Sequence, residues 1–373
     1  FAQYRGDKNM RIWNSPERQL KVAQDNLKYY NEELESNKDT DVNPEYIAYL
    51  QDAIENSREQ IKNYEYIIKN GLDEEAWKIQ LDQMIEYSKQ TIENYKNYDD
   101  EWSRRYLMQE QDNLEIYNYL RDNNVEPLYG WEYEAYNYMT SLMQFLGAGL
   151  LVCGIAVFMS DIVSGECTPA TLKFLLVQPV TRGKVLLSKF IAVTLTVITM
   201  ILGAELIGFV FVNLTSKLGG ASYPVSLGAK YNKIINSEGT AELVKVVGSG
   251  HIGSNLELFV KSMLFQGLFI VATCSVVFLI STLIKSSMVT MALSVVVTVF
   301  LTIASQLMVT IKDFAHLIFV NYADGISILT GISALTFNNP NMTVQNGIII
   351  MIATSVISYI IAHINFTRKD ILI

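Results

Sequence analysis

A single carboxylate, Glu205, lies inside an otherwise apolar run from Ile191 to Val212 and has the clearest chemical potential in the chain. A charged side chain in hydrocarbon is costly and should face neighbouring helices or a cavity. Glu205 is therefore a candidate for a substrate path or a proton relay, and equally for a structural hydrogen bond. Gln266 and Gln306, in other apolar runs, are its candidate partners and are assigned to the same path.

Motifs for metal, nucleotide or covalent chemistry are missing from the sequence. His251, His316 and His363 are widely separated and no CxxC or HExxH spacing occurs, whereas metal sites are built from clustered ligands. Nothing matches the phosphate-binding pattern GxxxxGK[ST]. We therefore expect no metal, no bound cofactor and no enzymatic activity on this chain. The three cysteines all lie outside residues 1–138, so no disulfide framework is implied.

The charges divide the chain into two regions. Residues 1–138 carry 16 Lys and Arg against 29 Asp and Glu, whereas residues 139–373 carry 13 against 9 and hold nearly all the long apolar runs. We interpret residues 1–138 as a water-soluble acidic lobe and residues 139–373 as a membrane domain. We expect no nucleic-acid partner.

The acidic lobe has the pattern of long amphipathic helices. Pro16 and Pro44 each follow a Ser or Asn and precede a Glu, which is typical of a helix start. Apolar residues then recur at spacings of three and four, and the second seam runs to Ile68. Residues 1–14 show no clear period. The pattern predicts a coiled-coil-like lobe, which is either a solvated spacer or, given its many Tyr and Trp, a docking surface.

The membrane domain has five apolar runs long enough to cross a bilayer as helices. They are Met139–Met159, Ile191–Val212, Leu256–Leu283, Met288–Ile311 and Asn346–Ile364. Gly147, Gly149 and Gly154 in the first run should permit close helix packing. Residues 312–345 contain only apolar pieces too short to cross, so two half-length or interfacial helices are expected there. Glu257 and Lys261 are one turn apart and should form a boundary ion pair.

The polar, basic insert between the first two runs, residues 160–189, is the segment best placed to receive an input from a soluble partner. Leu172, Leu175 and Leu176 form an apolar face on a short helix that Pro169 would begin and Pro179 would end. The charged contacts with the partner would come from Glu166, Lys173 and Arg182. The alternative is an interfacial amphipathic helix without a partner.

The residues of this insert resemble the cytosolic coupling segment of type-2 ATP-binding-cassette (ABC) exporter permeases. The similarity lies in Thr171–Leu176, in the turn Gln178–Arg182 and in the entry to the next run at Lys184–Lys189. The tail Phe366–Ile371 also resembles that family's ending. Cys167–Ala170 departs from the pattern, since members usually have a glycine before the position of Thr171.

The resemblance implies an all-α polytopic membrane helix bundle that acts as the permease subunit of an ATP-driven exporter. A separate ATPase subunit would bind ATP and Mg and would dock on residues 160–189. The coupling residues would be Glu166, Thr171, Leu172, Lys173, Leu175, Leu176, Pro179 and Arg182. The family has six spans and works as a dimer, so we expect the first span to precede Phe1, a homodimer, and an extracellular lobe. The expected cargo is amphipathic, such as a peptide.

Five spans put the acidic lobe and the basic C-terminus on opposite sides of the membrane, and the distribution of positive charge favours a cytosolic insert and C-terminus. On the cytosolic side lie Lys173, Arg182, Lys184, Lys189, Lys285, Arg368 and Lys369, against Lys217, Lys230, Lys233, Lys245 and Lys312 on the other. We expect a bacterial plasma membrane. A rival class is similar to phage-infection proteins and type VII secretion accessory proteins. These join a coiled-coil ectodomain to a comparable membrane half and act as receptors without an ATPase.

Overall fold

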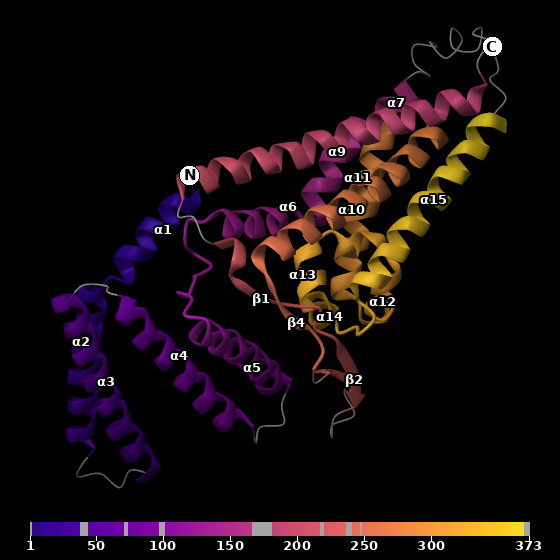
Figure 1. The fold of residues 1–373 in the computed structure, drawn as a ribbon. Helices are drawn as coiled ribbons and strands as arrows, with labels where there is room; N and C mark the ends of the chain where they lie inside the picture. Colours follow the sequence, from indigo (N-terminus) through magenta and orange to yellow (C-terminus); the bar gives the residue numbers. More distant parts are fainter. Residues whose placement is uncertain are drawn as a thin grey trace. The chain divides into compact units, whose positions relative to one another are not determined.

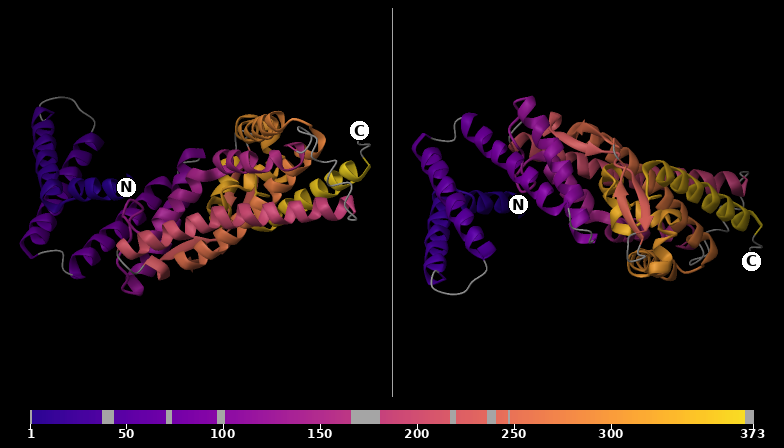
Figure 2. Two further views of the ribbon diagram at one scale, coloured as in Figure 1. Left: turned by 90° about the horizontal axis from the view of Figure 1, so that it is seen from above. Right: turned by 90° about the horizontal axis from the view of Figure 1, so that it is seen from below.

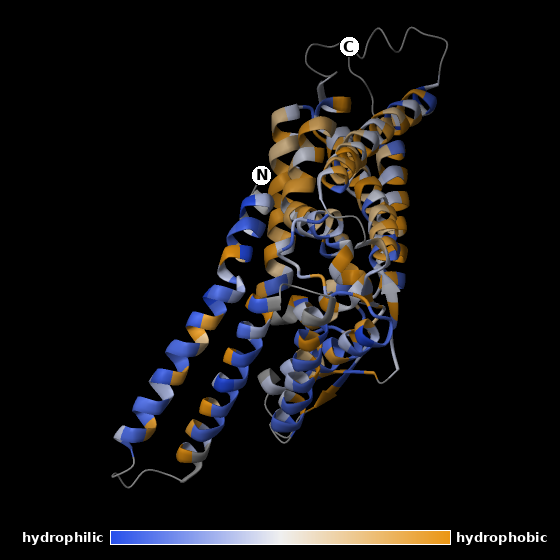
Figure 3. Ribbon diagram, turned by 60° about the vertical axis from the view of Figure 1, so that its left-hand side comes forward, coloured by the Kyte–Doolittle hydropathy of each residue, from blue (hydrophilic) through white to orange (hydrophobic). Residues whose placement is uncertain are grey.

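The computed structural model describes residues 2–37, 44–70, 74–96, 101–165, 181–216, 220–235, 241–246 and 248–368. The chain forms two compact units, Phe1–Tyr133, here called the lobe, and Glu134–Ile373, here called the bundle. Hydrophilic residues dominate the lobe helices, and hydrophobic residues concentrate on the long helices of the bundle (Figure 3). The described residues are 81% helical, which confirms the prediction of an all-α helix bundle.

The described lobe contains the helices α1 (Ala2–Trp13), α2 (Pro16–Ser36), α3 (Pro44–Asn70), α4 (Glu74–Tyr95) and α5 (Glu101–Asp122). The helix starts predicted at Pro16 and Pro44 are confirmed. The helix α1 was not expected from the sequence. Packing is pairwise, with α2 against α3 and α4 against α5 (Figure 1).

The lobe seams bury small and polar residues together with leucines. Leu50 and Leu81 are almost fully buried, and the buried Ser88 of α4 donates a hydrogen bond of 2.8 Å to Glu110 of α5. The expectation that Ile68 lies on the seam is wrong, because Ile67 is buried while Ile68 is 41% exposed. An α-helix has 3.6 residues per turn, so a strict seven-residue repeat drifts around its surface over several turns.

The long helices of the bundle are α6 (Ala135–Met159), α9 (Arg182–Thr215), α10 (Asn255–Leu283), α11 (Ser287–Leu307) and α15 (Val344–Arg368). By length and composition four of them, α9, α10, α11 and α15, can each cross a membrane. A fifth crossing is available if the bent pair Ala135–Gly147 and Gly149–Ser164 counts as one span. The last piece of that pair includes the short helix α7 (Asp161–Ser164).

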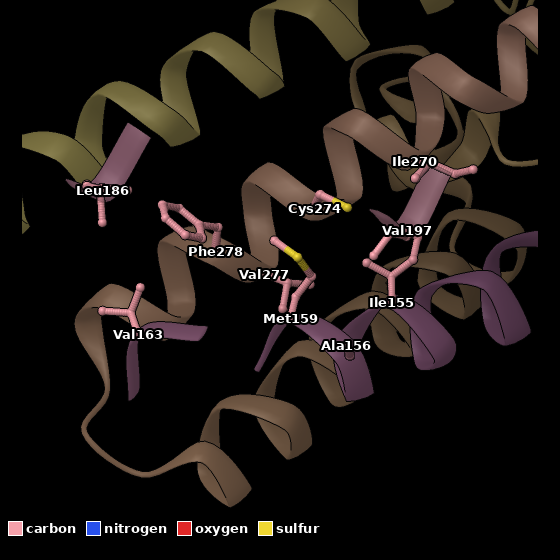
Figure 4. Packing of buried hydrophobic residues seen from close by; sticks show 11 residues of the cluster. Ile155, Ala156, Met159, Val163, Leu186, Val197, Ile270, Cys274, Val277 and Phe278 are labelled. Carbon is pink, nitrogen blue, oxygen red and sulfur yellow. The ribbon is translucent and has the colours of Figure 1, made fainter. Parts of the chain in front are cut away.

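The helix α10 is the centre of the bundle. Its apolar window is 56% buried, against 17–22% for α9, α11 and α15, and it packs against α6, α9, α11 and α15. Ile270, Cys274, Val277 and Phe278 of α10 form one cluster with residues of α6, α7, α9 and α15 (Figure 4). Burying several large apolar side chains on one helix stabilises a single arrangement of the others around it.

The first predicted span, Met139–Met159, is not one straight helix. Gly147 adopts φ 38° and ψ −163°, and the two halves of the segment are bent by 66° at this point. The expectation that Gly147, Gly149 and Gly154 allow close helix packing is also wrong within the described chain. A Cβ atom at any of the three would meet nothing within 4 Å. Gly147 is needed for its backbone conformation, which side-chain-bearing residues rarely adopt.

The segment between α9 and α10 contains strands, which the sequence reading did not foresee. After the short 3-10 helix η2 (Gly220–Ser222), β1 (Pro224–Leu227) pairs antiparallel with β4 (His251–Ser254). Inside that pair, β2 (Tyr231–Ile235) pairs antiparallel with β3 (Ala241–Lys245). Gly228 and Gly250, both with positive φ, separate the two ladders. The strands therefore form one interrupted hairpin.

The segment between α11 and α15 folds into five short helical pieces of three to six residues each, not into the two half-length helices that the sequence suggested. These are α12 (Val309–Lys312), η3 (Ala315–Leu317), η4 (Phe319–Tyr322), α13 (Gly325–Thr330) and α14 (Ile332–Phe337). They close against the hairpin, since the Gly228 N–H donates to the Leu329 carbonyl at 2.8 Å and Asn338 donates to the Ala241 carbonyl at 3.0 Å.

The bend at Gly147 leads to a stability prediction. Gly147→Ala would place a Cβ on a backbone conformation that almost only glycine adopts, so we expect it to destabilise the protein by about 1–3 kcal/mol. Gly149→Ala is the matched control, because that position is helical and equally open. We expect the apparent melting temperature in nanodiscs to fall for Gly147→Ala and to be unchanged or raised for Gly149→Ala. Equal melting temperatures for the two variants would contradict the bend.

Candidate functional site

The central part of the predicted coupling segment, residues 166–180, lies outside the described residues. It contains Glu166, Thr171, Leu172, Lys173, Leu175, Leu176 and Pro179, so their roles stay predictions. The structure describes both flanks of the segment, residues 160–165 before it and residues 181–189 after it. How these flanks are held decides which helices a displacement of the segment would move.

The first flank is held by a buried hydroxyl of the central helix α10. Ser281 donates a 2.9 Å hydrogen bond to the Ser160 carbonyl. The same hydroxyl accepts from the N–H groups of Val163 at 3.3 Å and Ser164 at 3.1 Å. Ser281 is 1% exposed, so these bonds form away from water. One side chain therefore satisfies both ends of the turn that joins α6 to α7.

The helix α11 adds a second contact to the same flank. The Ser287 hydroxyl donates to the Asp161 carboxylate at 2.5 Å and lies 3.2 Å from the Ser164 hydroxyl. Ser164 also donates to the Ser160 carbonyl. We call Ser160, Ser164, Ser281 and Ser287 the serine cluster. It ties the start of the insert to the turn between α10 and α11.

The second flank is the first turn of α9, which packs on α15. The helix begins at Arg182, after Thr181 in an extended conformation. A Cβ atom added to Gly183 would lie 2.6 Å from Cε1 of His363, so a larger residue here would force the imidazole ring to shift. One turn further on, Leu186 is fully buried. Phe190 then packs between Phe278 and Tyr359, with ring centroids 5.2 Å and 5.1 Å apart.

The insert is therefore bounded by two packed junctions on different helices. The serine cluster attaches its start to α10 and α11, and the Gly183 contact attaches its end to α15. Of the predicted coupling residues, the structure describes Arg182, which lies partly buried in the first turn of α9.

The second candidate site is a buried polar pair that joins α9 to α10. Gln266 donates from its amide nitrogen to Oε1 of Glu205 at 2.8 Å. Glu205 is 4% exposed and Gln266 is 3% exposed. The expectation that Glu205 faces another helix and meets Gln266 agrees with this geometry. Gln306 lies exposed on α11, and no described contact brings it to the pair.

Two side-chain oxygens of this pair make no hydrogen bond within the described structure, and they determine its possible chemistry. Oε2 of Glu205 and Oε1 of Gln266 are both buried and, among the described residues, have no hydrogen-bond partner. Both are acceptors, so they cannot bond to each other without a proton between them. A proton on Oε2 would allow the carboxyl to donate to an acceptor while Oε1 still accepts from Gln266. The arrangement is suited to a proton-carrying or ligand-contacting group.

Other polar groups of the bundle have simpler explanations. Lys261 lies 2.5 Å from Glu257, which confirms the predicted boundary pair, and His251 contacts the same carboxylate at 3.3 Å. Within the described ranges, no group of three His, Cys, Asp or Glu side chains could hold a metal ion.

Comparison with known proteins gives one match. A family model described as ABC-2 family transporter protein matches residues 22–371. No curated protein and no solved structure gives a significant match. The match includes the lobe helices from α2 onward as well as the bundle, so it covers nearly the whole chain.

The serine cluster leads to a test of how the insert is anchored. Ser281→Ala removes one acceptor and one donor from buried backbone groups, which should cost about 1–3 kcal/mol. Ser275→Ala is the matched control on the same helix, because Ser275 bonds only back to the Val271 carbonyl of its own helix. We expect a lower apparent melting temperature for Ser281→Ala and little change for Ser275→Ala. An equal effect of both would show that the cluster does not anchor the insert.

Proposed function

The chain belongs to the ABC-2 transporter family and is a membrane permease that partners an ABC ATPase, and on this premise we propose that it is an exporter. The observation that carries the proposal is the family match over residues 22–371. We assign the nucleotide site, with ATP and Mg, to a partner chain, and the lack of a phosphate-binding loop in this sequence supports that assignment. The permease then converts the movement of that partner into a change of the bundle.

In the proposed mechanism, the ATPase docks on residues 160–189. Leu172, Leu175 and Leu176 supply the apolar contact, and Glu166, Lys173 and Arg182 supply charged contacts, with Thr171 and Pro179 shaping the segment. The anchoring of both flanks supports this role, because a held segment transmits a displacement whereas a loosely attached one absorbs it. ATP binding would move the segment against α10 and α15, and hydrolysis would reset it.

The direction of transport and the cargo belong to the same proposal. We place the insert and the C-terminus in the cytosol of a bacterial cell and the lobe outside, where it would shape the exit or meet an extracellular partner. Two copies of the permease would form a homodimer, each with an ATPase. An amphipathic cargo such as a peptide is supported by the apolar composition of the long bundle helices.

Glu205 is the residue we assign to the cargo or proton path, and a conservative change tests this role. Glu205→Gln keeps an oxygen that accepts from Gln266 and adds donors for the Gln266 carbonyl, so the fold should be retained. We expect at least a tenfold loss of transport if the carboxyl takes up a proton or contacts cargo. The measurement is ATP-driven transport in proteoliposomes, compared with melting temperature. Unchanged transport would reduce the pair to a packing contact.

The coupling segment is tested by association with the ATPase. In Leu175→Asp combined with Arg182→Glu, we expect loss of co-purification with the partner ATPase, because an apolar and a cationic contact are both replaced by anions. Lys230→Glu, an exposed charge reversal in the hairpin segment, is the control and should leave the complex intact. If association and ATP turnover survive the double change, the coupling assignment is wrong and the ATPase-independent receptor becomes the better account.

A further inference from the structure

A groove of about 670 Å³ lies where the first turn of α9 meets the last turns of α15. The two helix ends lie side by side in each view (Figures 1 and 2). The end of the groove nearest the two helix ends is polar and is lined by Arg182 and Lys184 of α9 and Thr367 of α15. The opposite end is apolar and is lined by Leu187 and Ile360, and His363 and Ile364 lie between the two ends. The groove is therefore amphipathic along its length.

The polar end of the groove favours an anion. Its described lining includes Arg182 and Lys184 and contains no carboxylate. Lys184 is exposed, and no described carboxylate forms an ion pair with it. Nδ1 of His363 is buried without a hydrogen-bond partner among the described residues. The N-terminus of the 34-residue helix α9 adds a positive partial charge at the same place.

A second amphipathic groove in the bundle has a carboxylate beside its cations. It is lined by Leu264, Phe265 and Ile348, with His251 and Lys261 at its polar end. There, however, Glu257 lies 2.5 Å from Lys261 and 3.3 Å from His251. The cations of the second groove are thus balanced by a carboxylate of the same chain, so its polar end offers an anion little net attraction.

The apolar end of the α9–α15 groove fits a hydrocarbon chain. Leu187, Ile360 and Ile364 are 43%, 49% and 45% exposed, and all three lie on helices long and apolar enough to cross a membrane. Lys184 lies closer to the start of α9 than Leu187 does, and so nearer to the headgroup region of a bilayer.

We propose that the groove between α9 and α15 binds an anionic phospholipid, with its phosphate beside Lys184 and one acyl chain along Leu187 and Ile360. Basic pockets between transmembrane helices have the charge and the apolar wall that such lipids require. The bound lipid would lie against the contact of Gly183 with His363, and so at the end of the insert. This inference does not depend on docking of an ATPase.

The test counts lipids bound to the full-length protein by native mass spectrometry. Dioleoylphosphatidylglycerol and dioleoylphosphatidylcholine are added in competition, and we expect the anionic lipid to bind preferentially. Lys184→Gln should weaken phosphatidylglycerol binding about fivefold, the effect of one basic residue near a lipid surface. Leu187→Trp, which fills the apolar end, should reduce binding of the same lipid while Lys184 is retained.

Lys285→Gln is the matched control, since Lys285 is an exposed lysine of the turn between α10 and α11 and does not line the groove. It should leave the preference for phosphatidylglycerol unchanged, and an excess of inorganic phosphate should not displace the lipid. The proposal is overturned by equal binding of the two lipids to the unaltered protein, as would follow if another segment of the chain filled the groove. It is equally overturned if Lys285→Gln weakens binding as much as Lys184→Gln.

Discussion

The arrangement of the bundle depends on the hydrogen bonds that Ser281 makes to the backbone at Ser160, Val163 and Ser164. Backbone groups at a helix junction must be paired, and in apolar surroundings no water is available to pair them. A side chain on the most buried helix of the bundle provides the partner. The start of the insert therefore cannot move without breaking bonds that are expensive to lose or carrying α10 with it.

The central helix α10 contributes a side chain to both candidate sites. Its Gln266 faces α9 and pairs with Glu205, while Ser281, four turns later, faces α6 and α7. Between them, the cluster around Cys274 and Phe278 fixes the rotation of the helix. An input that shifts the start of the insert would reach Gln266 through α10, about 22 Å of helix given a rise of 1.5 Å per residue. An input at its end would reach Glu205 through α9, which begins at Arg182. The two sites are thus mechanically connected in a way that a loop could not provide.

The sequence was sufficient for features that follow from length and local chemistry. Uninterrupted apolar runs indicated α9, α10, α11 and α15, and prolines at helix starts indicated α2 and α3. The position of Glu205 in an apolar run was enough to expect a buried partner on another helix. Each of these features depends on residues within one segment of the chain, so it can be predicted without knowing the contacts between segments.

Features that depend on distant contacts were not predictable. Nothing local distinguishes Ser281 from other serines, since its partners are 117 to 121 residues away. The bend at Gly147 was interpreted as a packing feature because glycine serves either purpose. The strands between α9 and α10 are only four or five residues long and are interrupted by glycines, so their alternation is too short to recognise. The heptad pattern placed Ile68 on the seam whereas Ile67 is the buried residue, because a seven-residue repeat drifts around a 3.6-residue helix over several turns.

The central claim is that a separate ATPase docks on residues 160–189, and site-specific photocrosslinking in native membranes tests it most directly. A photoreactive amino acid would replace Lys173 in the insert. The comparison position is Lys233 on β2 of the hairpin, whose side chain lies 3.0 Å from Asp313. The account predicts an adduct with the ATPase from position 173 and none from position 233. No adduct from position 173, or equal adducts from both positions, would contradict it.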